Sequence, residues 1–263
     1  MDDASDGDEL YPGKLIRMLE IVWGDGWLSP GGPDEVDRVL EGLSLAGCAV
    51  LDIGSGAGGI DMQLVEKHNA LHVTAIDVED TVIDTARRKV AAKGLDHRIG
   101  FAKVAPGRLP LPPAAFDVVF SKDSIVHIPD KNALAAEIFR VLKPGGWFAA
   151  SDWLIGHDGE PSPEMRAYIA AEGLDFGMAS PSRYRAALEA AGFAEIAVTS
   201  RNAWYSQQAS EEIAAMRGPL YDKAAKELGA EFVDHNIAIW QRMLVVLESG
   251  EHCPSHLRAR KPL

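Results

Sequence analysis

The sequence predicts an α/β fold with a seven-stranded, mostly parallel sheet and helices on both faces. Two observations predict it. From residue 49 onward, apolar segments of strand length alternate with helical patterns, which is the signature of parallel strands joined by helical crossovers. The strand Ala49–Ile53 breaks into glycines at Gly54 and Gly56, and a helical pattern runs from Ile60 to Lys67. Strand, glycine turn and helix begin a nucleotide-binding unit, so the expected architecture is Rossmann-like.

The expected strands are short, apolar and rich in β-branched residues. The last one alternates in polarity and is expected to pair antiparallel to its neighbours. Asp130 is expected to cap one of the helices between them. The predicted strands are Ala49–Ile53, Leu71–Ile76, Ile99–Val104, Phe116–Phe120, Trp147–Ser151, Glu195–Thr199 and His256–Arg260; the predicted helices run from Asp80 or Thr81 to Lys93, from Lys131 to Leu142, and from Pro181 to Ala191.

Residues 10–45 are predicted to form an N-terminal helical lid. Apolar residues recur at helical spacing from Tyr11 to about Trp23, and Asp34 is expected to cap a second helix that ends near Leu43. Residues 1–9 are acidic and are predicted to be a disordered tail.

The alternation of strands and helices is interrupted after the fifth strand. Residues 154–182 hold proline, glycine and one short helical pattern, and residues 203–250 carry two longer ones, Gln207–Gly229 and Glu231–Leu247. An insertion at the carboxyl ends of parallel strands can cover a ligand crevice. Both segments are therefore predicted to be cap elements.

The composition favours a small-molecule partner. A net charge of -13 over 263 residues disfavours nucleic acids and anionic membranes, and no apolar run reaches the length of a membrane span. The N-terminus lacks the features of a signal peptide. Cys48, expected to be buried and inert, and Cys253 lie outside any metal-type spacing, so we expect no metal site and a cytoplasmic location. Either a monomer or a homodimer is compatible with these features.

The glycine turn is the first candidate for cofactor binding. Gly54, Gly56 and Gly59 fit the spacing GxGxxG. Asp77 ends the second strand about 20 residues later, the distance at which a carboxylate can bind a ribose hydroxyl pair. The spacing alone leaves NAD open as the ligand. Asp52, inside the strand just before the first glycine, argues against NAD.

The segments "VLDIGSGAGG", "AIDV" and "LKPGGWFAASDW" resemble motifs of the class I methyltransferases that depend on S-adenosylmethionine (SAM). The resemblance makes residues 46–263 the SAM-binding domain and S-adenosylhomocysteine (SAH) the product. It implies that Gly54 and Gly56 face the methionine part of SAM and that Asp77 holds the ribose. It extends the cofactor site to Asp52, Val78, Val104, Ala105 and Ser121. Ala105 stands where these enzymes usually have an aspartate that binds adenine.

Asp123 and His127 are the candidates for chemistry. They follow the fourth strand, and the carboxyl ends of strands face the ligand crevice of an open α/β sheet. Their spacing of four would place both side chains on one face of a helical turn. A carboxylate and an imidazole there form a plausible ligand and base, while a helix cap and a structural histidine remain the alternative.

"FDVVFSKDSIVHIPDK" is similar to the corresponding stretch of phosphoethanolamine N-methyltransferases, whose pattern is close to "YSRDAILHL". The resemblance implies that Asp123 contacts the acceptor amine and that His127 is the general base. It assigns the tyrosine partner of that base to Tyr11, at the family's distance before the loop Ser29–Gly32, and makes Ser29 a SAM contact. Two positions of the family's phosphate site differ, because Glu172 and Leu174 stand where an arginine and a tyrosine align.

Three further residues are predicted to bind the substrate. Trp153, at the end of the fifth strand, suits a substrate that becomes a quaternary ammonium, because an aromatic face attracts cations. Tyr168 and Arg183 are the candidates for binding the other end of the substrate. The remaining aromatic residues of interest are expected to pack in the core or the cap: Trp23, Trp27, Trp204 and Tyr205.

The sequence therefore predicts a SAM-dependent methyltransferase that acts on a small polar metabolite. The expected acceptor is an amine nitrogen in a phosphobase or an amino-acid-like compound. A thioether or thiol acceptor is the alternative, and a thioether would need no base at His127. A non-catalytic module that binds SAM or NAD is the alternative from another class.

Overall fold

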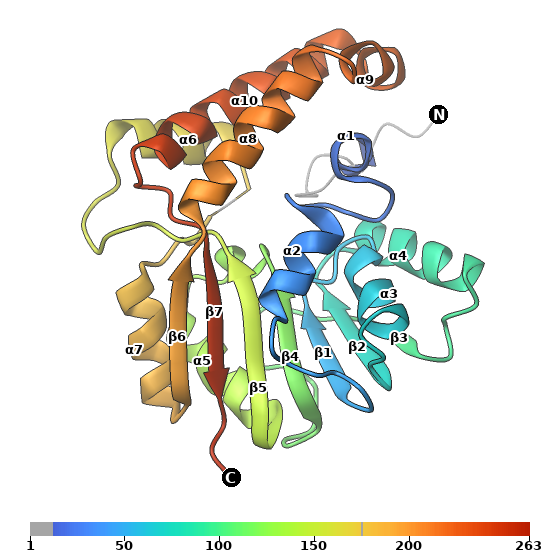
Figure 1. The fold of residues 1–263 in the computed structure, drawn as a ribbon, viewed down its shortest axis with the longest axis vertical. Helices are drawn as coiled ribbons and strands as arrows, with labels where there is room; N and C mark the ends of the chain where they lie inside the picture. The colour runs from blue at the N-terminus through green and yellow to red at the C-terminus, as the bar shows by residue number, and fades with distance from the viewer. Residues whose placement is uncertain (1–12, 175) are drawn as a thin grey trace.

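The computed structural model describes residues 13–174 and 176–263, so the predicted tail 1–9 and Tyr11 lie outside the described residues. Its centre is one seven-stranded sheet in the order β3-β2-β1-β4-β5-β7-β6. Only β7 runs antiparallel to its neighbours. The strands are β1 Ala49–Ile53, β2 His72–Asp77, β3 Ile99–Lys103, β4 Phe116–Lys122, β5 Leu142–Asp152, β6 Ala194–Ser200 and β7 Ser255–Arg260. The predicted α/β fold with helices on both faces is confirmed (Figure 1).

The helices of the described chain fall into three groups. Helices α5 and α7 cover one face of the sheet, and α2, α3 and α4 cover the other. The third group, with α1, α6, α8, α9 and α10, packs around its own apolar cluster. The bounds are α1 Gly13–Trp23, α2 Gly32–Val39, α3 Gly59–Glu66, α4 Asp80–Ala92, α5 Lys131–Val141, α6 Pro163–Glu172, α7 Pro181–Ala191, α8 Asn202–Arg217, α9 Tyr221–Leu228 and α10 Ala230–Glu248.

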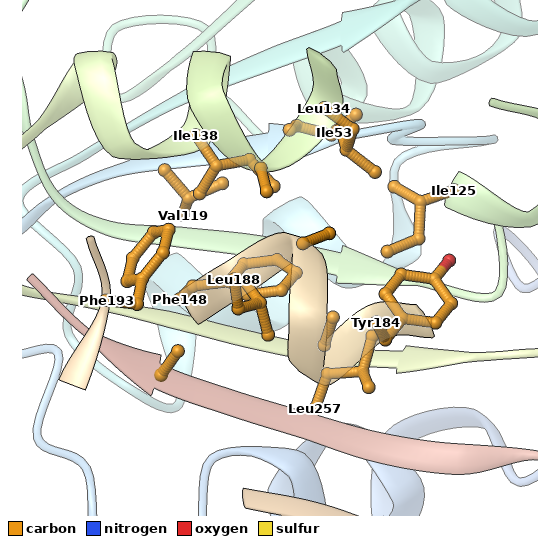
Figure 2. Packing of buried hydrophobic residues seen from close by; sticks show 14 of the residues in the cluster. Ile53, Val119, Ile125, Leu134, Ile138, Phe148, Tyr184, Leu188, Phe193 and Leu257 are labelled. Carbon is orange, nitrogen blue, oxygen red and sulfur yellow. The ribbon is translucent and has the colours of Figure 1, made fainter. Parts of the chain in front are cut away.

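The central strands are buried on both faces, as their continuous apolar runs require. Successive side chains alternate between two cores. In β1, Val50 packs with α2 and α3, while Leu51 packs with α5 and α7. Figure 2 shows the second of these cores, where Phe148 of β5 and Leu257 of β7 meet Leu188 of α7. This packing fixes the ends of the strands, which carry the candidate site.

The third group of helices lies over one end of the sheet, above the starting end of β7 (Figure 1). Its core includes Met18 of α1, Tyr168 of α6, Ile213 of α8 and Trp240 of α10. Because β7 is antiparallel to β5, its start lies beside the carboxyl end of β5, where Ser255 pairs with Asp152. The group therefore covers the edge of the sheet at which ligands bind in this architecture. Within the described chain, no helix has the length and apolarity to cross a membrane.

Several expectations about local structure are wrong. Helix α2 begins after Gly31, so Asp34 lies in its first turn and does not cap it. The helix predicted over 207–229 is two helices, α8 and α9. Cys48 is half-buried and not fully enclosed.

The predicted fifth strand also differs from the structure, and the lid formed by residues 10–45 remains a prediction. Of the lid, α1 packs with the cap and α2 packs in the core of the sheet. The fifth strand was expected to begin at Trp147, but β5 begins at Leu142. Residues 143–146 form a bulge in this strand: β4 pairs Phe116 with Leu142 and then Val118 with Trp147, and Gly145 has a left-handed φ of +79°. The bulge contacts the chain end, where Gly145 N donates to Lys261 O over 2.9 Å.

Candidate active site

The glycine turn after β1 is shaped by its protein neighbours as well as by any ligand. Gly54 has φ +73°, a left-handed conformation that glycine adopts without strain. A Cβ at Gly54 would overlap Ser124 Oγ. The hydroxyls of Ser121 and Ser124 each donate to Ile53 O over 2.8 Å. The turns after β1 and β4 are thereby joined, and Gly54 is needed for that packing. The cofactor contacts of Gly54, Gly56 and Ser121 remain predictions.

Asp77 ends β2 beside the glycine turn. Its carboxylate accepts from the backbone amides of Gly56 over 3.2 Å and Val78 over 2.7 Å. Burial raises the pKa of this carboxyl, and the backbone amides oppose that shift. Val78 exposes 44% of its surface, although large apolar side chains are normally buried. Ala105 is exposed just past β3, after Val104. A carboxylate beside apolar side chains fits a ribose next to a flat aromatic base.

Asp52 lies on β1 and faces helix α3. The carboxyl of Asp61, in the first turn of α3, interacts with it, and both side chains are fully buried without a hydrogen-bond donor among the described residues. Two charged carboxylates in one buried site repel each other, so one of the two groups retains a proton. Burial raises the pKa of Asp52 to about 7, and burial together with the charge of Asp52 raises that of Asp61 well above its usual value. The sequence analysis missed Asp61. That Asp52 contacts the cofactor remains a prediction.

Asp123 is the best-supported side chain of the site. Its backbone is left-handed, with φ 54°, which is uncommon outside glycine. The carboxylate accepts from Lys122 Nζ over 2.8 Å and Ser151 Oγ over 2.7 Å. Tyr205 OH lies 3.0 and 3.1 Å from its two oxygens. Three elements, β4, β5 and α8, thus fix this carboxylate at the carboxyl edge of the sheet.

His127 lies one turn beyond Asp123, at the end of the 3-10 turn Ile125–His127. The α-helical turn expected between them is therefore absent: the turn is tighter and starts after Asp123. Nδ1 lies 2.7 Å from Leu174 O in the cap. A carbonyl only accepts hydrogen bonds, so Nδ1 carries the proton and Nε2 is the basic nitrogen. Asp123 and His127 are brought to the same edge of the sheet, as predicted.

Aromatic rings form the wall next to His127. Phe176 lies 5.4 Å from the His127 ring and 5.6 Å from Trp153, between ring centroids. Tyr168 is fully buried and lies 6.2 Å from Phe176. Tyr168 hydrogen-bonds with Glu172, and burial raises the pKa of that carboxyl to about 7. Trp153 and Tyr168 therefore lie in the wall where the substrate is expected, whereas Arg183 is exposed and its Nε lies 3.3 Å from Asp158.

The sequence analysis missed Lys122 and Ser151 and assigned Tyr205 to packing. Tyr205 does pack in the apolar cluster of the third group of helices, but its hydroxyl also bonds to Asp123, and this contact was not predicted. A signal was available: Lys122 and Ser151 stand at the ends of β4 and β5, and Tyr205 lies in the first turn after β6. All three positions fall at the carboxyl edge of the sheet. The other aromatic residues pack as expected, with Trp23 stacked on Trp240.

The fold and the glycine turn define the class of this chain. Residues 50–146 match a family model described as a methyltransferase domain. The matched part contains the turn of Gly54, the carboxylate of Asp77 and the pair Asp123 and His127. The chain belongs to the class I SAM-dependent methyltransferases.

Within that class, the chain is similar to phosphoethanolamine N-methyltransferases. It is 31% identical to that of Triticum aestivum over 243 residues, covering 90% of this chain and 46% of the relative. It is 31% identical to phosphoethanolamine N-methyltransferase 1 of Arabidopsis thaliana, covering 92% of this chain and 48% of the relative. The chain thus spans about half the length of these curated relatives.

Solved structures agree on the fold. Phosphoethanolamine N-methyltransferase 2 of Haemonchus contortus, in complex with phosphomonomethylethanolamine and SAH, superposes with a TM-score of 0.87 at 26% identity. The match covers 94% of this chain and 57% of that one. A [4+2]-cyclase shares the fold with a TM-score of 0.72 at 22% identity over 94% of its chain. The chemistry of this chain must therefore be argued from its site, because one fold supports different reactions.

Proposed function

We propose that this chain transfers a methyl group from SAM to the nitrogen of a small amine. The proposal rests on the hydrogen bonds that the Asp123 carboxylate accepts. A carboxylate can accept about four hydrogen bonds. Here Lys122, Ser151 and Tyr205 supply three donors, so one acceptor site remains for an N–H of the substrate. SAM supplies the methyl group when it is bound.

His127 is the proposed base. A primary amine is protonated at neutral pH, and its nitrogen can accept a methyl group only after losing a proton. The bond from Nδ1 to Leu174 O fixes the tautomer and leaves Nε2 as the basic nitrogen. An imidazole has the pKa range for this task. Asp123 would orient the amine while His127 removes its proton. Tyr11 is proposed as the partner of His127 and Ser29 as a contact of SAM, by resemblance.

The proposed acceptor class is a phosphobase, because the curated relatives and the Haemonchus contortus enzyme are named for phosphoethanolamine. The cap of this chain differs from their pattern at Glu172, which bonds to Tyr168. Unphosphorylated ethanolamine and small amino acids are therefore the comparison substrates. Among the proposed substrate contacts, Trp153 would face the methylated ammonium group and Arg183 would need to leave Asp158 to reach a phosphate.

The proposal is tested in two steps. The chain is first titrated with SAH and with NAD, and only SAH is expected to bind. SAM consumption is then measured with phosphoethanolamine, ethanolamine, glycine and a thioether. Turnover on an amine is expected. Turnover on the thioether alone, or preference for NAD, would overturn the proposal.

Asp123→Asn is the matched site variant, and Asp84→Asn, on the exposed face of α4, is its control. A hydrogen bond to a charged group contributes about 1.5–3 kcal/mol. We expect Asp123→Asn to lower kcat/KM for the amine about 10- to 150-fold, and Asp84→Asn to leave it unchanged. Equal activities in the two variants would remove Asp123 from the site.

A cytoplasmic location is part of the proposal, because Cys48 and Cys253 are both free thiols. A monomer or a homodimer is proposed as the assembly, and light scattering distinguishes the two.

A further inference from the structure

Lys122 takes no part in the proton or methyl transfer of the proposed reaction, yet it donates to Asp123 and to a second part of the site. Its side chain is fully buried. Lysine is almost never buried completely unless its charge is paired and its donors are satisfied. Here the ammonium lies 2.5 Å from Ser29 Oγ, 2.8 Å from Pro30 O and 2.8 Å from Asp123 Oδ2. These three partners account for the three N–H donors of the side chain.

The partners of Lys122 belong to two different parts of the site. Ser29 and Pro30 belong to the loop between α1 and α2, residues 24–31, which we call the docking loop. This loop lies on the glycine turn, where Gly59 N donates to Gly26 O over 3.0 Å. A Cβ on Gly56 would stand 3.3 Å from Leu28. The docking loop therefore forms part of the proposed cofactor side.

Asp123 belongs to the acceptor side. Its two other donors, Ser151 and Tyr205, come from β5 and α8 and hold the carboxylate from the sheet and the cap. Among the donors described for Asp123, Lys122 is the one that also bonds the docking loop. A displacement of that loop would therefore change the position or the pairing of the carboxylate through a single ammonium group.

We propose that Lys122 is a positioning residue that couples the cofactor side of the site to the acceptor side. When the docking loop is seated on the glycine turn, Ser29 and Pro30 hold the ammonium, and the ammonium holds Asp123 Oδ2. The acceptor-binding carboxylate is then in place only when the cofactor side is assembled. The inference rests on the proposed function and names the link between its two subsites.

The prediction is a thermodynamic coupling that passes through Lys122. Two ligands that stabilise one arrangement bind cooperatively, and the coupling is reciprocal. Affinity for the amine is measured by calorimetry with and without saturating SAH. The probe is whichever of phosphoethanolamine and ethanolamine the wild-type chain methylates. We expect SAH to raise the affinity of the wild-type chain for that amine about 5- to 150-fold, the usual range for coupled sites.

Lys122→Met matches the apolar part of the side chain and removes the ammonium group with its charge and donors. We expect this variant to bind SAH and the amine independently, with a coupling factor near one. Lys122→Arg, which keeps a charge and donors in a different geometry, should restore part of the coupling. A role in stability alone would lower the melting temperature without changing the coupling factor, so the two roles give different results.

Lys131 provides the matched control. It is also buried, and its ammonium donates to Ile125 O over 2.7 Å and Ile128 O over 2.6 Å, away from the docking loop. Lys131→Met should lower stability and keep the coupling factor. Loss of coupling in both variants, or retention of coupling in folded Lys122→Met, would overturn the proposal.

Ser29→Ala tests the same link if Lys122→Met does not fold. It removes one acceptor of the ammonium and leaves the charge pair with Asp123. The coupling factor should fall between those of the wild type and an uncoupled site, and an unchanged factor would contradict the proposal. A wild-type chain that binds neither SAH nor an amine would instead refute the proposed function, and the role of Lys122 would fall with it.

Discussion

The buried pair Asp52 and Asp61 predicts that stability falls as pH rises through the neutral range. Burial raises the pKa of Asp52 to about 7 and that of Asp61 well above its usual value. An unfolded aspartate titrates near pH 4. Between pH 4 and 7 the folded chain therefore holds protons that the unfolded chain has released. The stability contributed by this pair is present below pH 4 and is lost as pH rises through the folded pKa values.

Asp61→Asn removes one of these protons and supplies an amide that can donate to Asp52. Each pH unit over which Asp61 retains its proton costs the wild-type chain about 1.4 kcal/mol. The advantage of the variant should therefore grow between pH 5 and pH 8, by on the order of 2 kcal/mol. At this chain length that corresponds to a rise in melting temperature of about 4–8 °C at pH 8.

Thermal unfolding followed by circular dichroism at pH 5 and pH 8 measures this difference. Asp84→Asn, whose side chain is 68% exposed, is the control and should shift neither transition. A melting temperature of Asp61→Asn below that of the wild type at pH 8, or equal shifts at both pH values, would refute the shared-proton interpretation of this pair.

Three further predictions concern the site and its support. His127→Ala should lower turnover of an amine about 10²- to 10⁴-fold at neutral pH, because a general base contributes that much, and nearly full activity would favour a thioether acceptor. Tyr205→Phe removes one donor from Asp123 and should raise the KM for the amine about 10-fold. The affinity for SAH, measured by calorimetry, should stay unchanged, and a large loss of SAH affinity would contradict this role. Gly54→Ala should lower the melting temperature, because its Cβ would overlap Ser124 Oγ. The decrease in melting temperature should be smaller in a Ser124→Gly background, and equal decreases in both backgrounds would argue against this contact.

Much of the fold could be predicted because its strands carry the signal themselves. Runs such as Phe116–Phe120 are apolar at every position except Asp117, as expected of strands buried on both faces. The start of β5 could not be predicted in the same way. Proline and glycine at 144–146 are typical of a turn, and the structure has a bulge there within a longer strand. This bulge is held by bonds to the chain end, more than a hundred residues away.

The site was predictable where chemistry and position coincide. Asp123 and His127 follow a strand end and have the functional groups that acid–base chemistry needs. Lys122 and Tyr205 act on Asp123 through contacts between distant elements, and the contact between Tyr205 and Asp123 spans 82 positions. Asp61 also acts through a contact between two elements, because its partner Asp52 lies on β1 while Asp61 lies on α3. A single sequence does not show which residues of different elements contact each other.

The acceptor atom is the central claim, and one measurement tests it directly. The wild-type chain is incubated with SAM carrying a ¹³C-labelled methyl group and with phosphoethanolamine, ethanolamine and a thioether together, and the product is identified by NMR. The account predicts the label on the nitrogen of an amine, with an initial rate of labelling about 10- to 150-fold lower in a parallel reaction of Asp123→Asn at matched enzyme concentration. A label on sulfur, or equal labelling of the amine by Asp123→Asn, would contradict it.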